Sequence, residues 1–549
     1  MLPSLIFEDD HLLVFNKPAG LNTHSPSPYA GEGLYDWLRH REPRWADLAI
    51  IHRLDKETSG IIVFSKTPIA NRSLTEQFTN RRVRKKYLLL TDRPVPEKAL
   101  TVKSALVRVG ERYISRPPHA GGDIAETRFR RSAELQLCAT PLVGSRRAGA
   151  LRSVEAEPLT GRTHQIRVHA AENGFPILGD TLYGGTPAAR VFLHAAALTL
   201  NHPVSGAEMT FRAPPDFATE PMAISPRLGL RAALLDPDET DAYRVLHGAS
   251  DGWPGWYVER LGDYLLSQSE QPLSPAQRAE IEQLMESLSV RGAYHKTMTR
   301  QVRKTTTTES SPALLLGRAA PDRFSVRENG LQFELSFGEG YSVGLFLDQR
   351  DNRRRLLSGH IAGDFSLFRP RSSATAPRIL NAFAYTCGLS ACAAKAGAHT
   401  TSLDLSRKYL DWGRRNFALN DLDPATHDFI YGDVFDWLRR LARKGRSFDA
   451  IALDPPTFSQ SRESGVFRAM KDYGRLVSAA LPLLAPGGVL FASTNAAEWP
   501  PEAFLADVDT AIQAARRSCL QRHYVPQPPD FPVSRGEPAY LKTVWLRIA

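Results

Sequence analysis

Asp55 stands between Arg53 and Lys56 in a short charged stretch, IHRLDKETSG, which runs from residue 51 to residue 60. Such a run is most often a surface turn whose charges pair with one another. Apolar segments of strand length flank it, LLVFN before it and GIIVFSK after it, so we expect the acid at the edge of a strand. A carboxylate held there beside a fixed guanidinium keeps its negative charge at neutral pH and is a candidate nucleophile or base.

A second group of polar residues follows a strand-like segment, LRSVEAEPL, at residues 151–159. In the stretch LTGRTHQIRVH this group comprises Arg162, His164, Arg167 and His169. Taken alone, these residues could be a solvated basic edge. Together with HRLD they form a much more specific pattern.

Two aspartates in the second half of the chain each follow a strand-like segment. The stretch ILNAFAYTCGLSACAAKAGA reads as strand, tight loop and helix, which is where a doubly wound sheet binds a nucleotide-like ligand. Gly388 is the only glycine in that loop, so the loop is a poor phosphate cradle. Asp404, in SLDLS, could accept hydrogen bonds from a ribose diol, and Asp433, in YGDVFDW, lies where an adenine amino group would be met.

The stretch DPPTF, from Asp454 to Phe458, follows another strand-like segment, FDAIAL. Two prolines at the end of a strand leave backbone carbonyls without competing donors nearby, and the phenylalanine offers a stacking face. A base with an amino or ring nitrogen could be held there. A loop that is merely stiffened by its prolines is the plain alternative.

The texture of the chain predicts three domains, at residues 1–222, 223–336 and 337–549. The first reads as short strands with many turns, which predicts a mostly antiparallel α+β domain. The second begins in a linker rich in proline and small residues and continues as a small α/β domain, with a helix that Ser274 would cap. The third alternates apolar strands with helices, which predicts a doubly wound, Rossmann-like α/β sheet with its site at the carboxyl ends of the strands.

The overall composition narrows the class of protein. A formal charge of +10 and a pI of about 9.4 favour a polyanionic partner. Four cysteines, far apart and irregularly spaced, fit neither a disulfide scaffold nor a zinc knuckle and predict a reducing compartment. The N-terminus, MLPSLIFEDD, has no basic region followed by an apolar run, and no run of about 18 apolar residues occurs in the chain. We therefore expect a cytoplasmic protein that does not bind membranes.

Over residues 5–217 the chain resembles the RluA family of RNA pseudouridine synthases. The stretches that carry the resemblance are FEDDHLLVFNKPAGL, HRLDKETSGIIVFSK, RKKYLL, LTGRTHQIRVH, GFPILGDTLYG and FLHAAALTLNHPVSG. The resemblance implies that Asp55 is the catalytic aspartate, that Tyr87 packs beside the target uridine, and that Arg167 pairs with the aspartate. It also implies that Arg53 fills the space left by a uridine turned out of its stack, and that no metal or organic cofactor is needed.

A basic run, NRRVRKKY, leads directly into Tyr87. A solvated charge run is the ordinary interpretation, but its position beside the expected pocket favours contacts with RNA phosphates. The residues concerned are Arg81, Arg82, Arg84, Lys85 and Lys86.

From about residue 237 to residue 500 the chain resembles the class I S-adenosylmethionine-dependent methyltransferases that modify 23S rRNA, of the RlmI and RlmK type. The stretches that carry this resemblance are RVLHGASDGWPGWYVERLGD, FGEGYSVGLFLDQRDNRR, NAFAYTCGLS, SLDLSRKYLDWGRRNFALN, GDVFDWL and LDPPTFSQS. It implies a central domain that helps to bind RNA and a catalytic motif made of Asp454, Pro455 and Phe458. The implied contacts to S-adenosylmethionine are Arg350, Phe383, Tyr385, Gly388, Asp404, Asp433 and Asp454.

The chain departs from that family pattern in two places. Cys387 stands where family members usually have a glycine. Relatives that form 5-methylcytosine carry a cysteine after the strand that follows DPP, because a thiolate must add to the pyrimidine ring. Here the strand reads VLFASTNAAEW, with Thr494, Asn495 and Ala496 in that region, and no thiol. A guanine nitrogen is therefore the better candidate for the methyl acceptor.

Together these patterns predict a bifunctional enzyme that isomerises uridine and methylates a base, most readily in rRNA, with tRNA possible and DNA not expected. Three alternatives stay open. The second half could be a non-catalytic RNA-binding module, or it could be a cytosine C5 methyltransferase after all. A wholly non-enzymatic RNA-binding protein would need both sites to have decayed, although both retain their carboxylates.

Overall fold

A computed structural model describes residues 2–31, 33–132, 151–215, 217, 228–298, 311–340, 342–369, 375–461, 465–534 and 537–549. By its internal contacts the chain divides into two compact units. The first unit comprises Met1–His24, Gly33–Tyr35 and Asp47–Asp236; the second comprises Ser25–Glu32, Asp36–Ala46 and Pro237–Ala549. The main division thus falls between Asp236 and Pro237, within what we predicted as the second domain, and the division into three domains stays a prediction.

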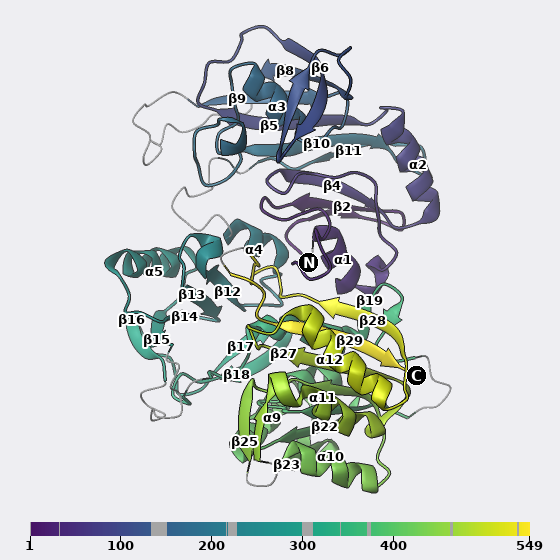
Figure 1. Cartoon of the computed structure of the whole chain (residues 1–549). Helices are drawn as coiled ribbons and strands as arrows, with labels where there is room; N and C mark the ends of the chain where they lie inside the picture. The colour runs from purple at the N-terminus through teal and green to yellow at the C-terminus, as the bar shows by residue number, and fades with distance from the viewer. Residues whose placement is uncertain are drawn as a thin grey trace. The chain divides into compact units, whose positions relative to one another are not determined.

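The first unit is built on an eleven-stranded sheet that is antiparallel except for one parallel pair, β4 with β10 (Figure 1). This confirms the mostly antiparallel α+β domain. Along the sheet the order is β1 (Leu5–Glu8), β2 (Leu12–Lys17), β4 (Ser59–Ser65), β10 (Leu193–Asn201), β5 (Arg84–Thr91), β9 (Arg152–Pro158), β8 (Asp123–Arg131), β6 (Leu100–Val109) and β7 (Arg112–Arg116). β3 (Ala49–Ile50) pairs with β4 and β11 (Glu208–Arg212) with β10, and the helices are α2 (Pro68–Thr79), α3 (Gln165–Glu172) and α4 (Leu228–Leu234), with the start of α1 (Leu34–Arg41).

A five-stranded sheet occupies the beginning of the second unit, in the order β12 (Ala242–His247), β13 (Trp256–Leu261), β14 (Tyr264–Ser269), β15 (Gly292–Thr297) and β16 (Ala313–Gly317). Its helix, α5 (Pro275–Ser287), connects the parallel strands β14 and β15. The sequence predicted the start of this helix correctly. The hydroxyl of Ser274 accepts a hydrogen bond from the backbone amide of Gln277, and the side-chain oxygen of Gln277 accepts one from the backbone amide of Ser274, which forms a complete capping box.

The rest of the second unit contains the predicted Rossmann-like sheet, with seven strands. Five parallel strands are followed by β29, which is antiparallel to them, and by β28, which is antiparallel to β29; the alternating sequence pattern did not predict this end of the sheet. Their order is β23 (Asp428–Tyr431), β22 (His399–Asp404), β21 (Arg378–Ala382), β24 (Phe448–Leu453), β27 (Leu484–Thr494), β29 (Lys542–Ile548) and β28 (Cys519–Val525). Its helices are α7 (Arg350–Ser358), α8 (Gly388–Lys395), α9 (Arg407–Ala418), α10 (Val434–Arg443), α11 (Ala469–Ala480) and α12 (Pro501–Ala514) (Figure 1). Short hairpins pair β17 (Phe324–Glu328) with β18 (Leu331–Leu335), β19 (His360–Ala362) with β20 (Phe365–Ser366) and β25 (Phe458–Ser461) with β26 (Gly465–Arg468).

Both faces of the seven-stranded sheet are buried against hydrophobic clusters. Neighbouring residues of a strand point to opposite faces, so they belong to different clusters. Along β21, Ile379 belongs to one hydrophobic cluster and Leu380 to the other. Ala450 and Ile451 of β24 divide in the same way. The strand order reverses between β21 and β24, which is where such sheets open a crevice at the carboxyl ends of their strands. Among the residues that the structure describes, no helix is long and apolar enough to cross a membrane.

Candidate active sites

Asp55 lies in the turn that leads into β4, and its side chain is 26% exposed. The turn closes where the amide of Thr58 donates to the Asp55 carbonyl, at 3.1 Å. Beneath it lies Lys17, fully buried at the end of β2. Its Nζ donates to the carbonyls of Pro18, Leu21 and Lys56, at 2.9, 2.8 and 3.2 Å. Lys17 therefore ties the Asp55 turn to the preceding strand, and burial lowers the pKa of its ammonium to about 7.

Arg167, on α3, faces Asp55 as the resemblance implied, but its closest partner is another aspartate. Its Nε and Nη2 each donate to the carboxylate of Asp180 at 2.7 Å, whereas its Nη1 lies 3.9 Å from Asp55 Oδ2. Burial alone would lower the pKa of Arg167, but the bonds to Asp180 and the charges of both aspartates raise it. Asp180, which is 1% exposed, thus fixes the guanidinium while leaving one of its nitrogens directed to Asp55.

Tyr87 and Arg53 occupy different environments around the same turn. Tyr87 lies on β5, opposite Ala195 of β10, and both its burial and the negative charge of Asp55 raise the pKa of its phenol. The phenol therefore stays protonated and can act as a hydrogen-bond donor or a packing surface. Arg53 is exposed, and its side chain has no hydrogen bond or ion pair within the part of the chain that the structure describes. This position fits a side chain that reaches out to RNA.

The two histidines of the predicted basic group have different surroundings. His169 is completely buried, and its ring nitrogens are bonded to the hydroxyls of Ser104 and Thr127, so its role is structural. His164 has a left-handed backbone, with φ of 55°, at the start of α3. Its Nδ1 lies 2.8 Å from the hydroxyl of Tyr183, whose ring is covered by the guanidinium of Arg167 at 5.1 Å. Asp180 and Tyr183 were not predicted as site residues, although both lie in the stretch GFPILGDTLYG.

The basic run before Tyr87 is only partly free for a ligand. Lys86 lies 2.7 Å from Glu155 and Arg84 lies 2.9 Å from Glu208. Lys85 lies over the ring of Phe78. The remaining members, Arg81 and Arg82, are exposed.

In the second unit, six of the predicted residues line one cavity of about 320 Å³ at the carboxyl ends of the parallel strands. These are Phe383, Tyr385, Asp404, Asp433, Asp454 and Pro455. The cavity also has aromatic walls that the sequence did not indicate, among them Phe346, Tyr409, Phe435 and Phe467. A cavity lined by aromatic side chains with a few well-placed polar groups is typical of small-molecule sites.

The loop after β21 has an unusual backbone. Phe383, Tyr385 and Cys387 all have left-handed φ angles, of 63°, 49° and 61°, although none of them is glycine. Hydrogen bonds hold the loop in this conformation: the amide of Tyr385 donates to Asp404 at 2.8 Å, and the hydroxyl of Thr386 donates to the carbonyl of Gly344 at 2.6 Å. The glycine expected at position 387 is thus replaced at a position where glycine is the least strained residue.

Gly413 of α9 makes room for the side chain of Cys387. A Cβ atom at Gly413 would lie 2.3 Å from the sulfur of Cys387, which is a severe overlap. The two positions therefore depend on each other, since the larger residue in the loop requires the smallest residue on the helix.

Asp404, the last residue of β22, and Asp433, which follows β23, both accept hydrogen bonds from backbone amides. The oxygens of Asp404 accept from the amides of Tyr385 and Ser406, each at 2.8 Å, while burial raises the pKa of the acid. Asp433 caps α10 by accepting from the amide of Asp436 at 3.1 Å. It also accepts from the hydroxyl of Ser461 at 2.6 Å.

Asp454 follows the last residue of β24, and its hydrogen-bond partners are neutral. The amide of Gln349 donates to Asp454 Oδ2 at 3.1 Å and to the hydroxyl of Ser493 at 2.8 Å. Burial raises the pKa of Asp454 to about 6, supported by the nearby carboxylate of Asp348. Behind it the hydroxyl of Tyr473 bonds to the carbonyls of Leu453 and Ser493 and accepts the amide of Ser493, which fixes the ends of β24 and β27.

Three predicted residues do not line this cavity. Arg350 is 4% exposed, and its guanidinium bonds to Asp530 through both terminal nitrogens, rather than pointing at a ligand. Gly388 is buried where a side chain would meet Arg353 and Leu345 at 3.4 Å. Phe458 is on β25, one residue before Ser459, which does line the cavity, so its ring points to the opposite side of that strand.

None of the cysteines within the described residues lines the cavity. Cys387 and Cys392 are buried, and burial raises the pKa of Cys387 to about 12 and that of Cys392 further. Cys519 lies on β28, and Cys138 is outside the described residues. After β27, where a thiol was sought, Asn495 lines the cavity instead.

Comparison with known families assigns both halves. Residues 244–547, more than half of the chain, match the S-adenosylmethionine-dependent methyltransferase family. The chain belongs to this family. Residues 11–172 match the RNA pseudouridylate synthase family, so the methyltransferase is joined to a second RNA-modifying domain. Both resemblances seen in the sequence are thereby confirmed, and S-adenosylmethionine is the methyl donor of the second half.

Several individual proteins are similar to parts of the chain. The ribosomal RNA large subunit methyltransferase of Deinococcus radiodurans is 34% identical over 331 residues, which cover 58% of this methyltransferase and 77% of that protein. The crystal structure of the methyltransferase SMU.776 with SAH is 30% identical, covers 56% of this chain and 76% of that one, and has a TM-score of 0.48. The human RNA pseudouridylate synthase domain containing 1 is 26% identical, covers 39% and 84%, and has a TM-score of 0.32.

Proposed function

We propose that the chain isomerises a uridine to pseudouridine at Asp55 and transfers a methyl group to a guanine nitrogen beside Asp454, both in large-subunit ribosomal RNA. The arrangement of Asp55, Arg167 and Asp180 supports the first activity. The second is supported by the cavity that gathers Asp404, Asp433 and Asp454. Relatives named as large-subunit ribosomal RNA methyltransferases support the choice of RNA.

In the first half, uridine must lose its bond from nitrogen to C1′ and regain one through carbon. Asp55 acts next to the sugar, either by attacking C1′ or by removing the proton at C2′. Arg167 orients the carboxylate and balances its charge, and Asp180 prevents the guanidinium from turning away. Tyr87 closes the pocket beside the base while it is detached. The uridine must first leave its stack, which costs a few kcal/mol and least in an unpaired loop.

The cavity of the second half suits S-adenosylmethionine. Both carboxylate oxygens of Asp404 accept hydrogen bonds from backbone amides, and Asp404 lies at the end of β22, where such sheets bind a ribose. Asp433 lies after the neighbouring strand, β23. The aromatic side chains of Tyr385 and Phe435 provide apolar walls for the adenine. When bound, S-adenosylmethionine supplies an electrophilic methyl carbon.

The acceptor is assigned from the chemistry that the residues allow. Carbon 5 of cytosine requires a covalent adduct with a thiolate, and no cysteine of the described residues lies at the cavity. A guanine nitrogen needs only a hydrogen-bond acceptor that orients it and takes up its proton, together with correct positioning. Asp454 and the adjoining proline carbonyls supply that acceptor face.

Mass spectrometry of nucleosides decides between these acceptors. Ribosomal RNA from a deletion strain, treated in vitro with the full chain and S-adenosylmethionine, should gain pseudouridine and a methylguanosine. Dominant 5-methylcytidine would contradict the assignment of the acceptor. Calorimetry with S-adenosylmethionine tests the remaining alternative, a non-catalytic module, because a chain that binds no donor at millimolar concentration cannot transfer its methyl group.

A further inference from the structure

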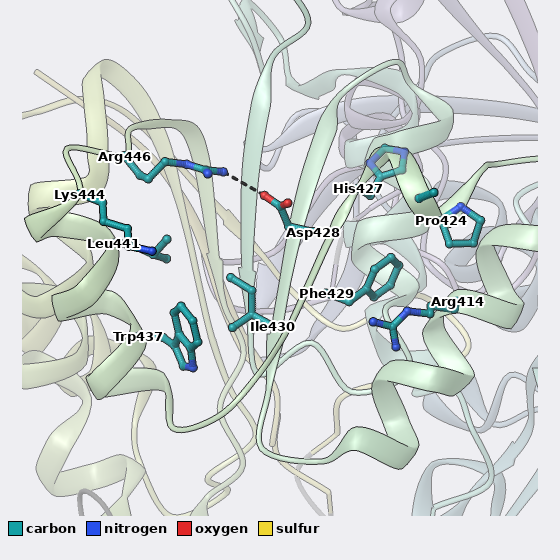
Figure 2. Close-up of a pocket in the computed structure, with 11 residues that line it drawn as sticks. Arg414, Pro424, His427, Asp428, Phe429, Ile430, Trp437, Leu441, Lys444 and Arg446 are labelled. Atoms are coloured by element: carbon teal, nitrogen blue, oxygen red, sulfur yellow. Dashed lines mark hydrogen bonds and ion pairs between the residues drawn. The ribbon is translucent and has the colours of Figure 1, made fainter.

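A second pocket of about 430 Å³ opens on the free edge of β23, and it shares no lining residue with the donor cavity. β23 is the outermost strand of the seven-stranded sheet. Figure 2 shows Trp437, Leu441 and Lys444 on one side of this strand and Arg414, Pro424 and Phe429 on the other. The mechanism proposed above uses none of these residues.

Charge is the first property of this pocket. Three cationic side chains line it, Arg414, Lys444 and Arg446, against the single carboxylate of Asp428. That carboxylate is already engaged, since Arg446 bonds to it at 2.9 Å and the hydroxyl of Thr401 at 3.0 Å (Figure 2). Burial lowers the pKa of His427, so its ring adds no positive charge. The lining therefore keeps a surplus of positive charge for an anionic ligand.

Donors without acceptors are the second property. The Nε of Arg446 is shielded from solvent and has no hydrogen-bond partner among the described residues. Lys444 is exposed, and no ion pair to it occurs in the same part of the chain. Among the described residues the ion pair of Arg414 is with Asp411, on the surface, at 2.6 Å, a kind of pair that contributes little and exchanges readily.

The third property is a series of aromatic rings covered by guanidinium groups. Phe429 and Tyr431 alternate along β23, so their rings point to the same face of the strand. Arg414 lies 4.7 Å from the centre of the first ring and Arg407 lies 4.7 Å from the centre of the second. Tyr431 is nevertheless 49% exposed. On the other side of the strand, Arg440 lies 5.3 Å from the ring of Trp437.

Aromatic rings and guanidinium planes side by side are the surfaces on which unpaired bases stack, while the cations contact the phosphates between them. We infer that the free edge of β23 binds an unpaired stretch of the RNA substrate. This inference rests on the proposed function, because it gives that RNA a second attachment to the methyltransferase half. A peptide strand added to β23 is the competing occupant, but the strand has only four residues and its surroundings are cationic.

The test compares two double variants of the full chain that each lose two positive charges. Arg414→Gln with Lys444→Gln changes the pocket, and Arg439→Gln with Lys471→Gln changes exposed residues on α10 and α11 outside it. Binding is measured by fluorescence anisotropy with a short labelled single-stranded RNA over a range of salt concentrations. The pocket variant should bind about five-fold more weakly, and its salt slope should fall by about 1.4, for two lost phosphate contacts. The control should stay close to wild type.

A third variant, Tyr431→Leu, separates stacking from charge. It should weaken binding of the single strand by about three-fold or more and leave binding of a duplex of the same sequence unchanged, because paired bases offer no free face. Affinity for S-adenosylmethionine, measured by calorimetry, should be unchanged in all three variants and shows that they are folded.

Equal RNA affinity in the pocket variant and its control would overturn the inference. This result is independent of the proposed function, which fails instead if the wild-type chain binds S-adenosylmethionine but methylates no RNA. For an active wild type, the pocket variant should raise the KM for RNA and leave kcat unchanged, because the edge of β23 does not contact the reacting atoms. A fall in kcat with an unchanged KM would also contradict a binding role.

Discussion

The two reactive aspartates are held in opposite ways. Asp55 sits at the rim of the first site, 26% exposed, with a guanidinium 3.9 Å away that a second aspartate fixes. Asp454 lies in an apolar cavity among an amide, hydroxyls and another carboxylate, and its pKa rises to about 6. A carboxylate that is buried near another carboxylate has a raised pKa and can exchange a proton near neutral pH, whereas one beside a guanidinium has a counter-charge. In the proposed function, the two sites use the same side chain for different chemistry.

The sharpest test of this contrast removes the charge of Asp55. Asp55→Asn should lower pseudouridine formation by about 1000-fold or more, because an amide of the same shape can neither attack nor accept a proton. Methyl transfer by the same protein should be unchanged and serves as the internal control. A tritium-release assay on uridine-labelled RNA measures the first activity. Near wild-type turnover would show that Asp55 is not the reactive group.

The reciprocal change, Asp454→Asn, should lower methyl transfer by about 100-fold, since the amide still accepts one hydrogen bond but takes up no proton. Pseudouridine formation should be unaffected. Transfer of a radiolabelled methyl group to RNA gives the rate, and calorimetry should show that S-adenosylmethionine still binds. An unchanged rate would show that the methyl acceptor does not bind at the DPPTF segment.

Asp180→Asn tests whether the orientation of Arg167 matters as much as its presence. We expect pseudouridine formation to fall by about 10-fold. The free energy of unfolding should fall by about 3 kcal/mol, because a buried guanidinium loses its counter-charge. Asp123→Asn, which removes an exposed partner of Arg162, is the matched control and should change stability by less than about 1 kcal/mol. Urea unfolding followed by circular dichroism measures both variants.

The rate of methyl transfer should depend on pH through Asp454. Because the pKa of Asp454 is about 6, methyl transfer should rise about 10-fold between about pH 5 and pH 7, with its midpoint near that value. The raised pKa of Asp454 affects the free energy of unfolding in the opposite direction, since it stabilises the protein at low pH and not at high pH. A raised folded-state pKa stabilises the protonated form, so this contribution is full below about pH 4 and is lost as the pH rises through about 6. A rate of methyl transfer that does not change between about pH 5 and pH 7 would show that protonation of Asp454 does not control it.

The smallest effect concerns the loop that replaces glycine with Cys387. Gly413→Ala should destabilise the chain by about 1–3 kcal/mol, since its Cβ would overlap the sulfur of Cys387. Adding Cys387→Gly should restore most of that loss, whereas Cys387→Gly alone should change stability by less than about 1 kcal/mol. Thermal unfolding of all four forms provides the double-mutant cycle. Additive effects would show that the two positions do not depend on each other.

Much of the second site could be predicted because its residues follow strands that the sequence pattern marks clearly. Asp404, Asp433 and Asp454 all meet at one edge of a parallel sheet, which the alternation of strands and helices already required. The supporting contacts could not be predicted in this way. Arg350 was assigned to the donor from its motif, yet it bonds to Asp530, which is 180 residues later in the chain.

The same limit applies to the first site. Asp55 and Arg167 were found because each lies in a dense local motif, while Asp180 lies between neighbours that give no sign of its partner. Tyr473, which joins the ends of β24 and β27, was missed for the same reason. Local patterns identify the residues that bear chemistry, but the residues that hold them in place are chosen by packing across the fold.

The left-handed loop at Phe383, Tyr385 and Cys387 has a consequence for the entropy of ligand binding. Each such residue is disfavoured by about 1–2 kcal/mol when it is not glycine, and folding has already met that cost through the surrounding hydrogen bonds. The loop is therefore preorganised, and donor binding requires little further ordering of the backbone. Association with S-adenosylmethionine should accordingly be fast and carry a small loss of conformational entropy.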